Sequence, residues 1–265
     1  MLNYDVLSRQ MGPAWRVQCH GELDSTQTAM RTWLLQDGRA DWRLLAAEHQ
    51  TAGRGRSGAQ WLDNPGQSLL MTLAGPVTLP IEAWPRLSLL AGLATLEFLS
   101  AQPGLQGVDL QLKWPNDLLV QTPQGLRKCA GILAERLEVP SQPPRWLCGL
   151  GLDVGGSLAP ELAEIAMSLC EVATGPLPSR SELAAGLAAA IRREVEGFRG
   201  VLPVERLGRR LAFVGQLVEL DLGPLQPARQ LRLAGLAHDG QLLGTWLDHP
   251  ETTVTVQPLA LRPVA

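Results

Sequence analysis

The sequence has few cysteines and no long apolar run. Its four cysteines are widely spaced and form no C-x-x-C pair, which favours neither a disulfide framework nor a zinc site (Cys19, Cys129, Cys148 and Cys170). No apolar stretch approaches the ~18 residues that a membrane span requires, and the first residues lack the basic and apolar regions of a signal peptide. We therefore expect free thiols, a cytoplasmic enzyme or binding protein, no metal-ligand cluster and no membrane partner.

Positive charge is not in excess either. The 23 lysine and arginine side chains stand against 26 aspartates and glutamates, which gives a net charge of −3. Such a chain has no general attraction to nucleic acid, and local groups such as Arg192-Arg193 are interpreted as solvated helix faces. With 45% hydrophobic and 18% charged residues, the composition is that of a globular protein.

Hydrophobic periodicity predicts a large domain of mixed structure followed by a small one. Helices are expected from Ser25 or Thr26 to about Gln36, with Gly38 as the stop, at 84–99, and from the Ser179–Glu182 capping box to about Phe198. Strands are expected at 42–48, 68–73, 109–113, 117–121, 129–137 and 145–152. These strands resemble hairpins more than βαβ repeats, so an α+β fold is predicted for residues 1–210.

Residues 211–265 are expected to form a small all-β domain. Asp239-Gly240 is predicted to be a hairpin turn, and Pro224, Pro227 and Pro250 are expected to separate short strands.

An arginine- and glycine-rich loop is the most informative segment. Gly53-Arg54-Gly55-Arg56-Ser57-Gly58 fits the G-x-G-x-x-G pattern, but Asp63-Asn64-Pro65-Gly66 soon follows, although the dinucleotide fingerprint needs a helix there. Glycine lets the backbone approach a ligand closely, and each guanidinium can bind a phosphate or carboxylate through two hydrogen bonds. The segment indicates a loop that closes over an anion; a flexible surface loop with solvated arginines is the alternative.

Three later segments carry polar residues or glycines within apolar strands. Lys113-Trp114-Pro115-Asn116-Asp117 suits a polar turn, although a turn alone requires neither the lysine nor the tryptophan. Lys128 precedes the apolar run that ends at Glu135, a position typical of a lysine that reaches out to solvent. The Gly149-Leu150-Gly151 segment is typical of a strand that another group approaches closely.

Together these segments resemble the biotin protein ligases, or biotin–[acetyl-CoA-carboxylase] ligases. The resemblance covers about half the chain and is carried by Asp24-Ser25-Thr26, Glu48 to Trp61, Lys113 to Asp117, Lys128 with Gly131 to Glu135, and Gly149 to Gly151. It implies a catalytic domain similar to class II aminoacyl-tRNA synthetases, with a mixed β-sheet and packed helices, and a small C-terminal SH3-like β-barrel. It also implies ATP and biotin as substrates, Mg²⁺, a biotin carboxyl carrier protein of acetyl-CoA carboxylase as acceptor, and often a homodimer.

The resemblance assigns a binding role to residues from several segments. For biotin and biotinyl-5'-AMP these are Ser25, Thr26, Gln27, Gln50, Arg54, Gly55, Arg56 and Lys128. For the nucleotide, Trp61 is expected to stack on adenine, and Asn116 to help hold the phosphates and magnesium. The sequence departs from the family pattern at Ala59, where a second glycine-arginine is common, and at Asp153, where an asparagine is common.

Three of the implied site residues are expected to be catalytic: Arg56, Lys128 and Asp117. The biotin carboxylate must attack the α-phosphorus of ATP, so Arg56, Lys128 and Mg²⁺ are expected to reduce the repulsion between two anions. The acceptor lysine has an ordinary pKa of ~10.4 and must lose a proton before it attacks. Asp117 is the carboxylate expected to orient or deprotonate that amine.

Three alternatives to a biotin ligase without a DNA-binding domain stay open. A lipoate or octanoate ligase shares the catalytic fold, and a non-catalytic biotin sensor needs the same binding residues. A ligase that also represses transcription is disfavoured, because only about 23 residues precede Asp24, whereas a domain usually has about 50 or more.

Overall fold

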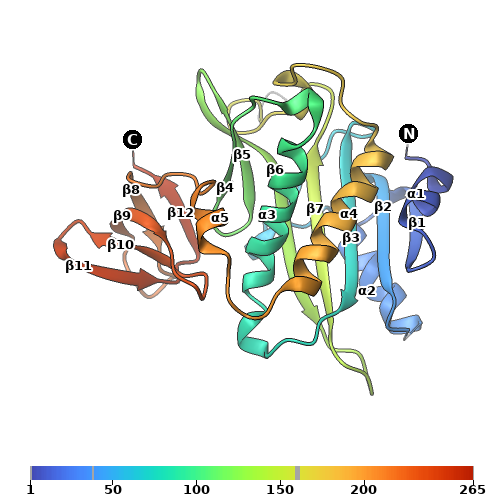
Figure 1. Cartoon of the computed structure of the whole chain (residues 1–265), viewed down its shortest axis with the longest axis horizontal. Coiled ribbons are helices and arrows are strands. Elements are labelled where there is room, and N and C mark those ends of the chain that lie inside the picture. Colours follow the sequence, from blue (N-terminus) through green and yellow to red (C-terminus); the bar gives the residue numbers. More distant parts are fainter. Residues whose placement is uncertain (1, 38, 159–161, 265) are drawn as a thin grey trace.

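The computed structural model describes residues 2–37, 39–158 and 162–264, and its main feature is a seven-stranded mixed sheet (Figure 1). The strand order is β1-β2-β3-β7-β6-β5-β4, with β1 and β2 parallel and all other neighbours antiparallel. The strands are β1 (Trp15–Leu23), β2 (Trp42–Gln50), β3 (Ser68–Pro76), β4 (Leu110–Lys113), β5 (Asp117–Thr122), β6 (Gly125–Leu137) and β7 (Arg145–Asp153).

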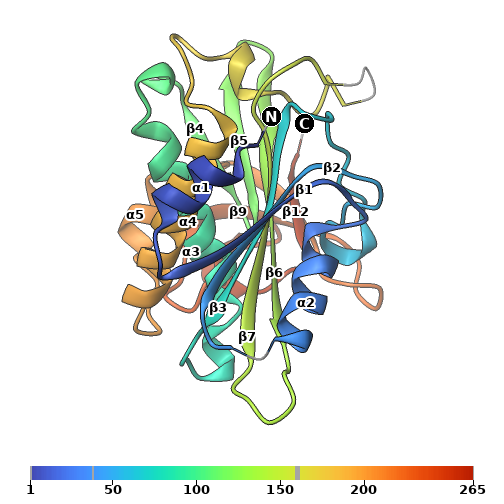
Figure 2. The same ribbon diagram turned by 90° about the vertical axis from the view of Figure 1, so that its right-hand side faces the viewer.

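Helices cover both faces of this sheet. They are α1 (Tyr4–Met11), α2 (Thr26–Gln36), α3 (Arg86–Ser100) and α4 (Arg180–Gly197), while the short α5 (Val204–Gly208) contacts β9 (Arg229–Leu236) of the C-terminal sheet. Helices α1, α3 and α4 lie on one face and α2 lies on the other, as the edge view shows (Figure 2). Short 3₁₀ turns occupy Arg56–Gly58, Ile81–Ala83, Pro103–Leu105 and Leu169–Glu171.

The alternation of side chains along the central strands creates two apolar layers. Leu150 and Leu152 of β7 join the large core under α3 and α4, whereas Leu147 joins a smaller cluster with Met30 and Leu34 of α2. Successive side chains of a strand point to opposite faces, so Gly149 and Gly151 lie on the same face as Leu147. The face under α2 thus carries both a small core and a stretch of bare backbone.

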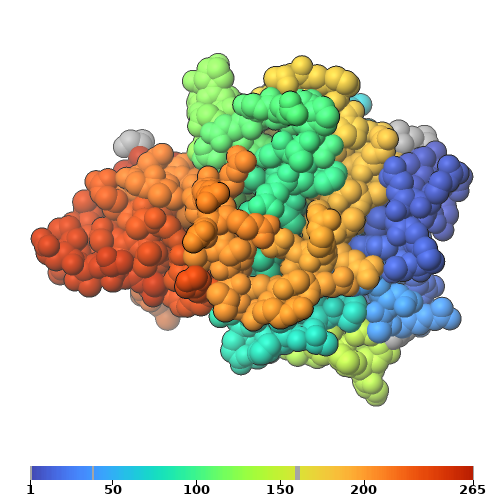
Figure 3. All heavy atoms as spheres, viewed as in Figure 1, coloured from blue at the N-terminus to red at the C-terminus, as the bar shows by residue number. Residues whose placement is uncertain are grey.

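The C-terminal residues form a second, five-stranded antiparallel sheet in the order β11-β10-β9-β8-β12. Its strands are β8 (Leu217–Asp221), β9 (Arg229–Leu236), β10 (Leu242–Trp246), β11 (His249–Val256) and β12 (Ala260–Pro263). It makes a lobe at one end of the larger part (Figure 3). The indole of Trp114 donates to the carbonyl of Gly240 at 2.9 Å, which joins the two parts.

The α+β prediction is confirmed, and each expected helix and strand lies within a few residues of its predicted place. Ser25 caps α2 by accepting from the backbone N–H of Gln27, and the Ser179–Glu182 capping box opens α4. Gly38, expected to end α2, lies outside the described residues. The division at residue 210 stays a prediction.

One βαβ unit is present in the larger part, because β1 and β2 run parallel with α2 between them, but no regular βαβ alternation follows it. One expectation about the strands is wrong. Pro250, expected to separate strands, lies inside β11, which is an edge strand, where a missing N–H costs no ladder hydrogen bond. Within the part of the chain that the structure describes, no helix is both long and apolar enough to span a membrane.

Candidate active site

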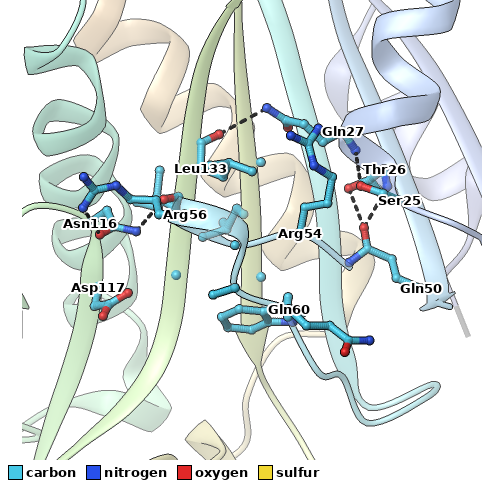
Figure 4. A pocket seen from close by; sticks show the side chains of 18 of the residues that line it. Ser25, Thr26, Gln27, Gln50, Arg54, Arg56, Gln60, Asn116, Asp117 and Leu133 are labelled. Carbon is cyan, nitrogen blue, oxygen red and sulfur yellow. Dashed lines mark hydrogen bonds between the residues drawn. The ribbon is translucent and has the colours of Figure 1, made fainter. Parts of the chain in front are cut away.

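A cavity of about 230 Å³ opens on the face of the sheet that α2 covers (Figure 4). Every residue predicted for the site lines it: Ser25, Thr26, Gln27, Gln50, Arg54, Gly55, Arg56, Trp61, Asn116, Asp117 and Lys128. The sequence separates these residues by up to about a hundred positions, and the fold brings them together through the start of α2, the end of β2 with the loop after it, and the beginnings of β5 and β6. The roles assigned to them stay predictions.

The floor of the cavity is glycine backbone. Gly131 of β6 pairs with Gly151 of β7, and the indole of Trp61 lies against both. A Cβ atom would come within 2.8 Å of this ring at Gly131 and within 2.4 Å at Gly151. Any side chain at either position would therefore displace Trp61, which explains the glycines that the sequence places there.

Lys128 reaches the same floor because of an irregularity in β6. Its register with β5 shifts between the partners Leu118 and Leu119, which pair with Ala130 and Lys128. An extra residue of this kind changes where a strand points its side chains. Lys128 thereby shares the cavity face with Gly131, three residues later, and its ammonium lies 5.3 Å from the centre of the Trp61 ring.

The N-terminus of α2 forms one wall through buried polar groups. Thr26 and Gln27 are almost completely buried. The Gln50 side-chain carbonyl accepts from the backbone N–H of Thr26 at 2.7 Å and from its hydroxyl at 3.0 Å. The Gln27 carbonyl oxygen lies 3.1 Å from the hydroxyl of Thr72, and its NH₂ group donates to Oε2 of Glu135 at 3.2 Å. Because a carboxylate only accepts, the amide orientation of Gln27 is fixed.

Three cations converge on the cavity, each with a protein partner. The Lys128 ammonium lies 2.7 Å from Oδ1 of Asp117. Arg56 Nη1 donates to Oδ1 of Asn116 at 3.3 Å, and burial lowers the pKa of Arg56 while the nearby charge of Asp117 acts in the opposite direction. The third cation, Arg54, forms an ion pair outside the cavity lining. These partners hold the cations in place and are exchangeable for ligand oxygens.

The arginine loop is folded on itself. The Trp61 N–H donates to the Gly53 carbonyl at 3.0 Å, and the Gly55 N–H donates to the Ala59 carbonyl at 2.7 Å. At its base His49 Nδ1 lies 2.9 Å from Oδ2 of Asp63, whose side chain is almost completely buried. The loop therefore reaches the cavity from a fixed stem.

Sequence reasoning missed several residues that support this site. Thr72, Asp63 and Arg31 carried no local signal. Thr72 reaches the site through strand pairing and Arg31 through the packing of α2, whereas Asp63 folds back from the loop onto the end of β2. Glu135 was part of the quoted motif but had no assigned role. Such side chains hold the lining residues and do not line the cavity themselves.

The site has the chemistry of an acid-activating ligase, because three cations and a set of amide and hydroxyl groups surround one cavity with a bare backbone floor. Cations placed this way can hold a carboxylate beside a phosphate, and the polar wall can hold a neutral polar group. Comparison with known proteins defines the class more closely. The sequence model of the biotin/lipoate A/B protein ligase family matches residues 21–153, and the chain belongs to this family.

Named proteins of similar sequence are also ligases. The biotin–[acetyl-CoA-carboxylase] ligase of Mycobacterium tuberculosis is 32% identical over 195 residues, which is 72% of this chain and 69% of that protein. The bifunctional ligase/repressor BirA of Bacillus subtilis is 31% identical over 58% of this chain and 46% of its own length. The chain thus spans about half of the bifunctional relative.

The fold also matches solved structures. The biotin protein ligase of Aquifex aeolicus in complex with biotin and ATP superposes with a TM-score of 0.75 and 24% identity, covering 94% of this chain and 99% of that chain. At this identity the likeness shows the shared fold.

Proposed function

We propose that this protein is a biotin–[acetyl-CoA-carboxylase] ligase, which forms biotinyl-5'-AMP from biotin and ATP and transfers biotin to a lysine of a carrier protein. The observation that carries the proposal is the convergence of Arg54, Arg56 and Lys128 on one cavity, in a chain of this ligase family. A carboxylate and a triphosphate repel each other, and cations from two separate segments are what their approach requires.

In the first step the biotin carboxylate attacks the α-phosphorus of ATP and pyrophosphate leaves. Ser25, Thr26, Gln27 and Gln50 hold the neutral end of biotin through their amide and hydroxyl groups, and Arg54 and Gly55 lie along it. Arg56 and Lys128 stabilise the charge that develops on the phosphoryl oxygens. Trp61 offers a flat apolar surface to adenine, and its place on the glycine floor supports this role.

In the second step the amine of the acceptor lysine attacks the carbonyl of the mixed anhydride, and AMP leaves with the bonding electrons. The amine must first lose a proton, and Asp117 is the carboxylate proposed to take it or to orient the amine. Asp117 is paired with Lys128 at 2.7 Å. When Lys128 turns to the phosphate, the carboxylate becomes available to the incoming amine.

Mg²⁺ is the metal that the nucleotide implies, and the residues fit it. Asn116 offers an amide oxygen beside the cavity, and Mg²⁺ usually needs one or two protein oxygens in addition to phosphates. When bound, it would neutralise part of the triphosphate charge. Asn116 holds its own position by donating to the Ile132 carbonyl at 2.8 Å.

The remaining parts of the proposal concern the setting of the enzyme. The acceptor is a biotin carboxyl carrier domain of acetyl-CoA carboxylase, in line with the name of the mycobacterial relative. A homodimer and a cytoplasmic location are proposed from the family resemblance, and free thiols at all four cysteines are compatible with a reducing compartment. Residues 1–210 are proposed as the catalytic domain and 211–265 as a C-terminal β domain.

Exchange of pyrophosphate into ATP by the purified chain tests the proposal. We expect exchange that depends on biotin and that lipoate or octanoate does not support. Exchange with lipoate alone would make the chain a lipoate ligase. Tight biotin binding without exchange or transfer to a carrier domain would make it a sensor.

A further inference from the structure

Glu135 lies near the end of β6 and connects two walls of the site without lining the cavity. Its Oε2 atom accepts from Gln27 Nε2 at 3.2 Å and from Arg31 Nη2 at 3.1 Å. Its Oε1 atom accepts from Arg54 Nη2 at 3.1 Å. One carboxylate therefore binds Gln27 of the polar wall, Arg31 of α2 and Arg54 of the arginine loop.

We propose that Glu135 is a positioning residue that anchors the arginine loop over the cavity and fixes the amide of Gln27 for the ligand. This inference rests on the proposed function, because it concerns the same biotin site. The Gln27 amide is held from both ends, since its carbonyl accepts from Thr72 and its NH₂ group donates to Glu135. Figure 4 shows the Arg54 side chain extending toward Gln27, which brings the loop to this wall.

The charges indicate an anchor and not a ligand-binding carboxylate. A negative charge that faced the ligand would repel its carboxylate and phosphates. Glu135 instead forms ion pairs with two arginines, Arg31 and Arg54, so these three side chains together have a net positive charge. The Glu135 side chain is 20% exposed and its Arg31 and Arg54 partners are 37% and 45% exposed, so solvent partly screens each ion pair and the expected effect is modest.

The effect should fall on ligand binding more than on chemistry. Without Glu135, Arg54 loses a charge-assisted hydrogen bond, and the loop and the Gln27 amide gain alternative conformations. Binding then has to order both groups, so the biotin affinity decreases. The reacting groups at Lys128, Arg56 and Asp117 keep their partners, so the rate at saturating biotin should change little.

The test compares Glu135→Gln with Glu138→Gln. Both substitutions remove one negative charge, but Glu138 is largely exposed and pairs with Arg136 at 2.6 Å. For Glu135→Gln we expect KM for biotin to rise about fivefold in pyrophosphate exchange, with kcat within about twofold of the wild type. Glu138→Gln should match the wild type in both constants.

Limited trypsin digestion measures the loop directly, because trypsin can cleave after Arg56. We expect Glu135→Gln to speed this cleavage several-fold relative to Glu138→Gln, with biotin reducing the difference. In an Arg54→Gln background the Glu135 substitution should have no further effect on cleavage after Arg56. Should Glu135→Gln lower the Tm, Glu135→Asp serves as the second variant, with an intermediate effect expected because it keeps the charge.

Three results would overturn the inference. One is cleavage and KM equal to those of Glu138→Gln, and another is a fall in kcat without a rise in KM. The third is an unchanged effect of Glu135→Gln on cleavage when Arg54 is already replaced. A wild-type chain without biotin-dependent exchange would refute the proposed function instead, and the cleavage comparison would still test the anchor.

Discussion

Replacement of Lys128 by alanine removes a positive charge from the floor of the cavity. The ammonium lies beside Asp117 and above Gly131, and its side chain is 34% exposed. In the proposed reaction the same ammonium stabilises the charge that develops between the biotin carboxylate and the α-phosphate. The variant therefore tests the electrostatic part of the mechanism.

The magnitude follows from Coulomb's law. Two unit charges ~4 Å apart interact by about 4 kcal/mol at an effective dielectric constant of ~20, and by about 1 kcal/mol in bulk water. Because Lys128 is about one-third exposed, an intermediate value of about 3 kcal/mol is reasonable. This corresponds to roughly a hundredfold lower rate of adenylate formation.

The assay is biotin-dependent pyrophosphate exchange at saturating biotin and ATP, with circular dichroism to establish folding. Arg127→Ala is the matched control, because it removes the neighbouring positive charge from the same strand and Arg127 does not line the cavity. Lys128→Arg should recover part of the activity, since it keeps the charge but not its position. The reasoning is refuted if Lys128→Ala keeps more than about a third of the wild-type rate, or if Arg127→Ala loses as much.

Three further variants test other parts of the site. Asp117→Asn should slow transfer to the carrier domain more than it slows adenylate formation, and single-turnover measurements of the two steps showing equal losses would count against a role for Asp117 in transfer. Gly151→Ala should weaken biotin and ATP binding at least tenfold, because the added methyl group would meet the Trp61 ring at 2.4 Å. Isothermal titration calorimetry measures both affinities, and unchanged values would show that the Trp61 ring can shift without loss of binding. Asp153→Asn should stabilise the fold at neutral pH, because burial raises the pKa of Asp153 to about 6 from an ordinary value of 3.8. With the folded pKa raised, the ionised carboxylate costs stability that grows as the pH rises from about 4 to about 6, so the gain should reach up to about 3 kcal/mol at pH ~7.5 and nearly vanish below pH ~4. Urea unfolding at both pH values checks this, and an equal gain at both would refute the assignment.

Local sequence patterns were sufficient for most of the fold. The apolar spacing of α3 and the capping residues of α2 and α4 define helices without tertiary information, and β2, β3 and β7 are short, largely apolar runs. Strand β1 was missed because it is a half-buried edge strand with mixed polar and apolar residues, and α5 because it has only five residues. Neither has a periodic signal of its own.

The site likewise contains residues that local sequence patterns predict and residues that they do not. Its lining residues could be predicted because they lie in compact motifs, with the arginine loop as the main example. Thr72 and Glu135 could not be, since strand register decides which side chains meet across the sheet. The orientation of Lys128 depends on the irregular pairing of β6 with β5, which no spacing along the chain reveals.

The bare backbone under Trp61 limits how such a site can change its ligand. Any side chain at Gly131 or Gly151 would meet the Trp61 ring before it reached a ligand. Substitution in this floor therefore removes space and adds no new contact to the ligand. A change of preference toward a bulkier or differently shaped acid must therefore come from substitutions in the polar wall and the arginine loop. Variation in ligand preference among proteins with this floor should be concentrated in those two segments.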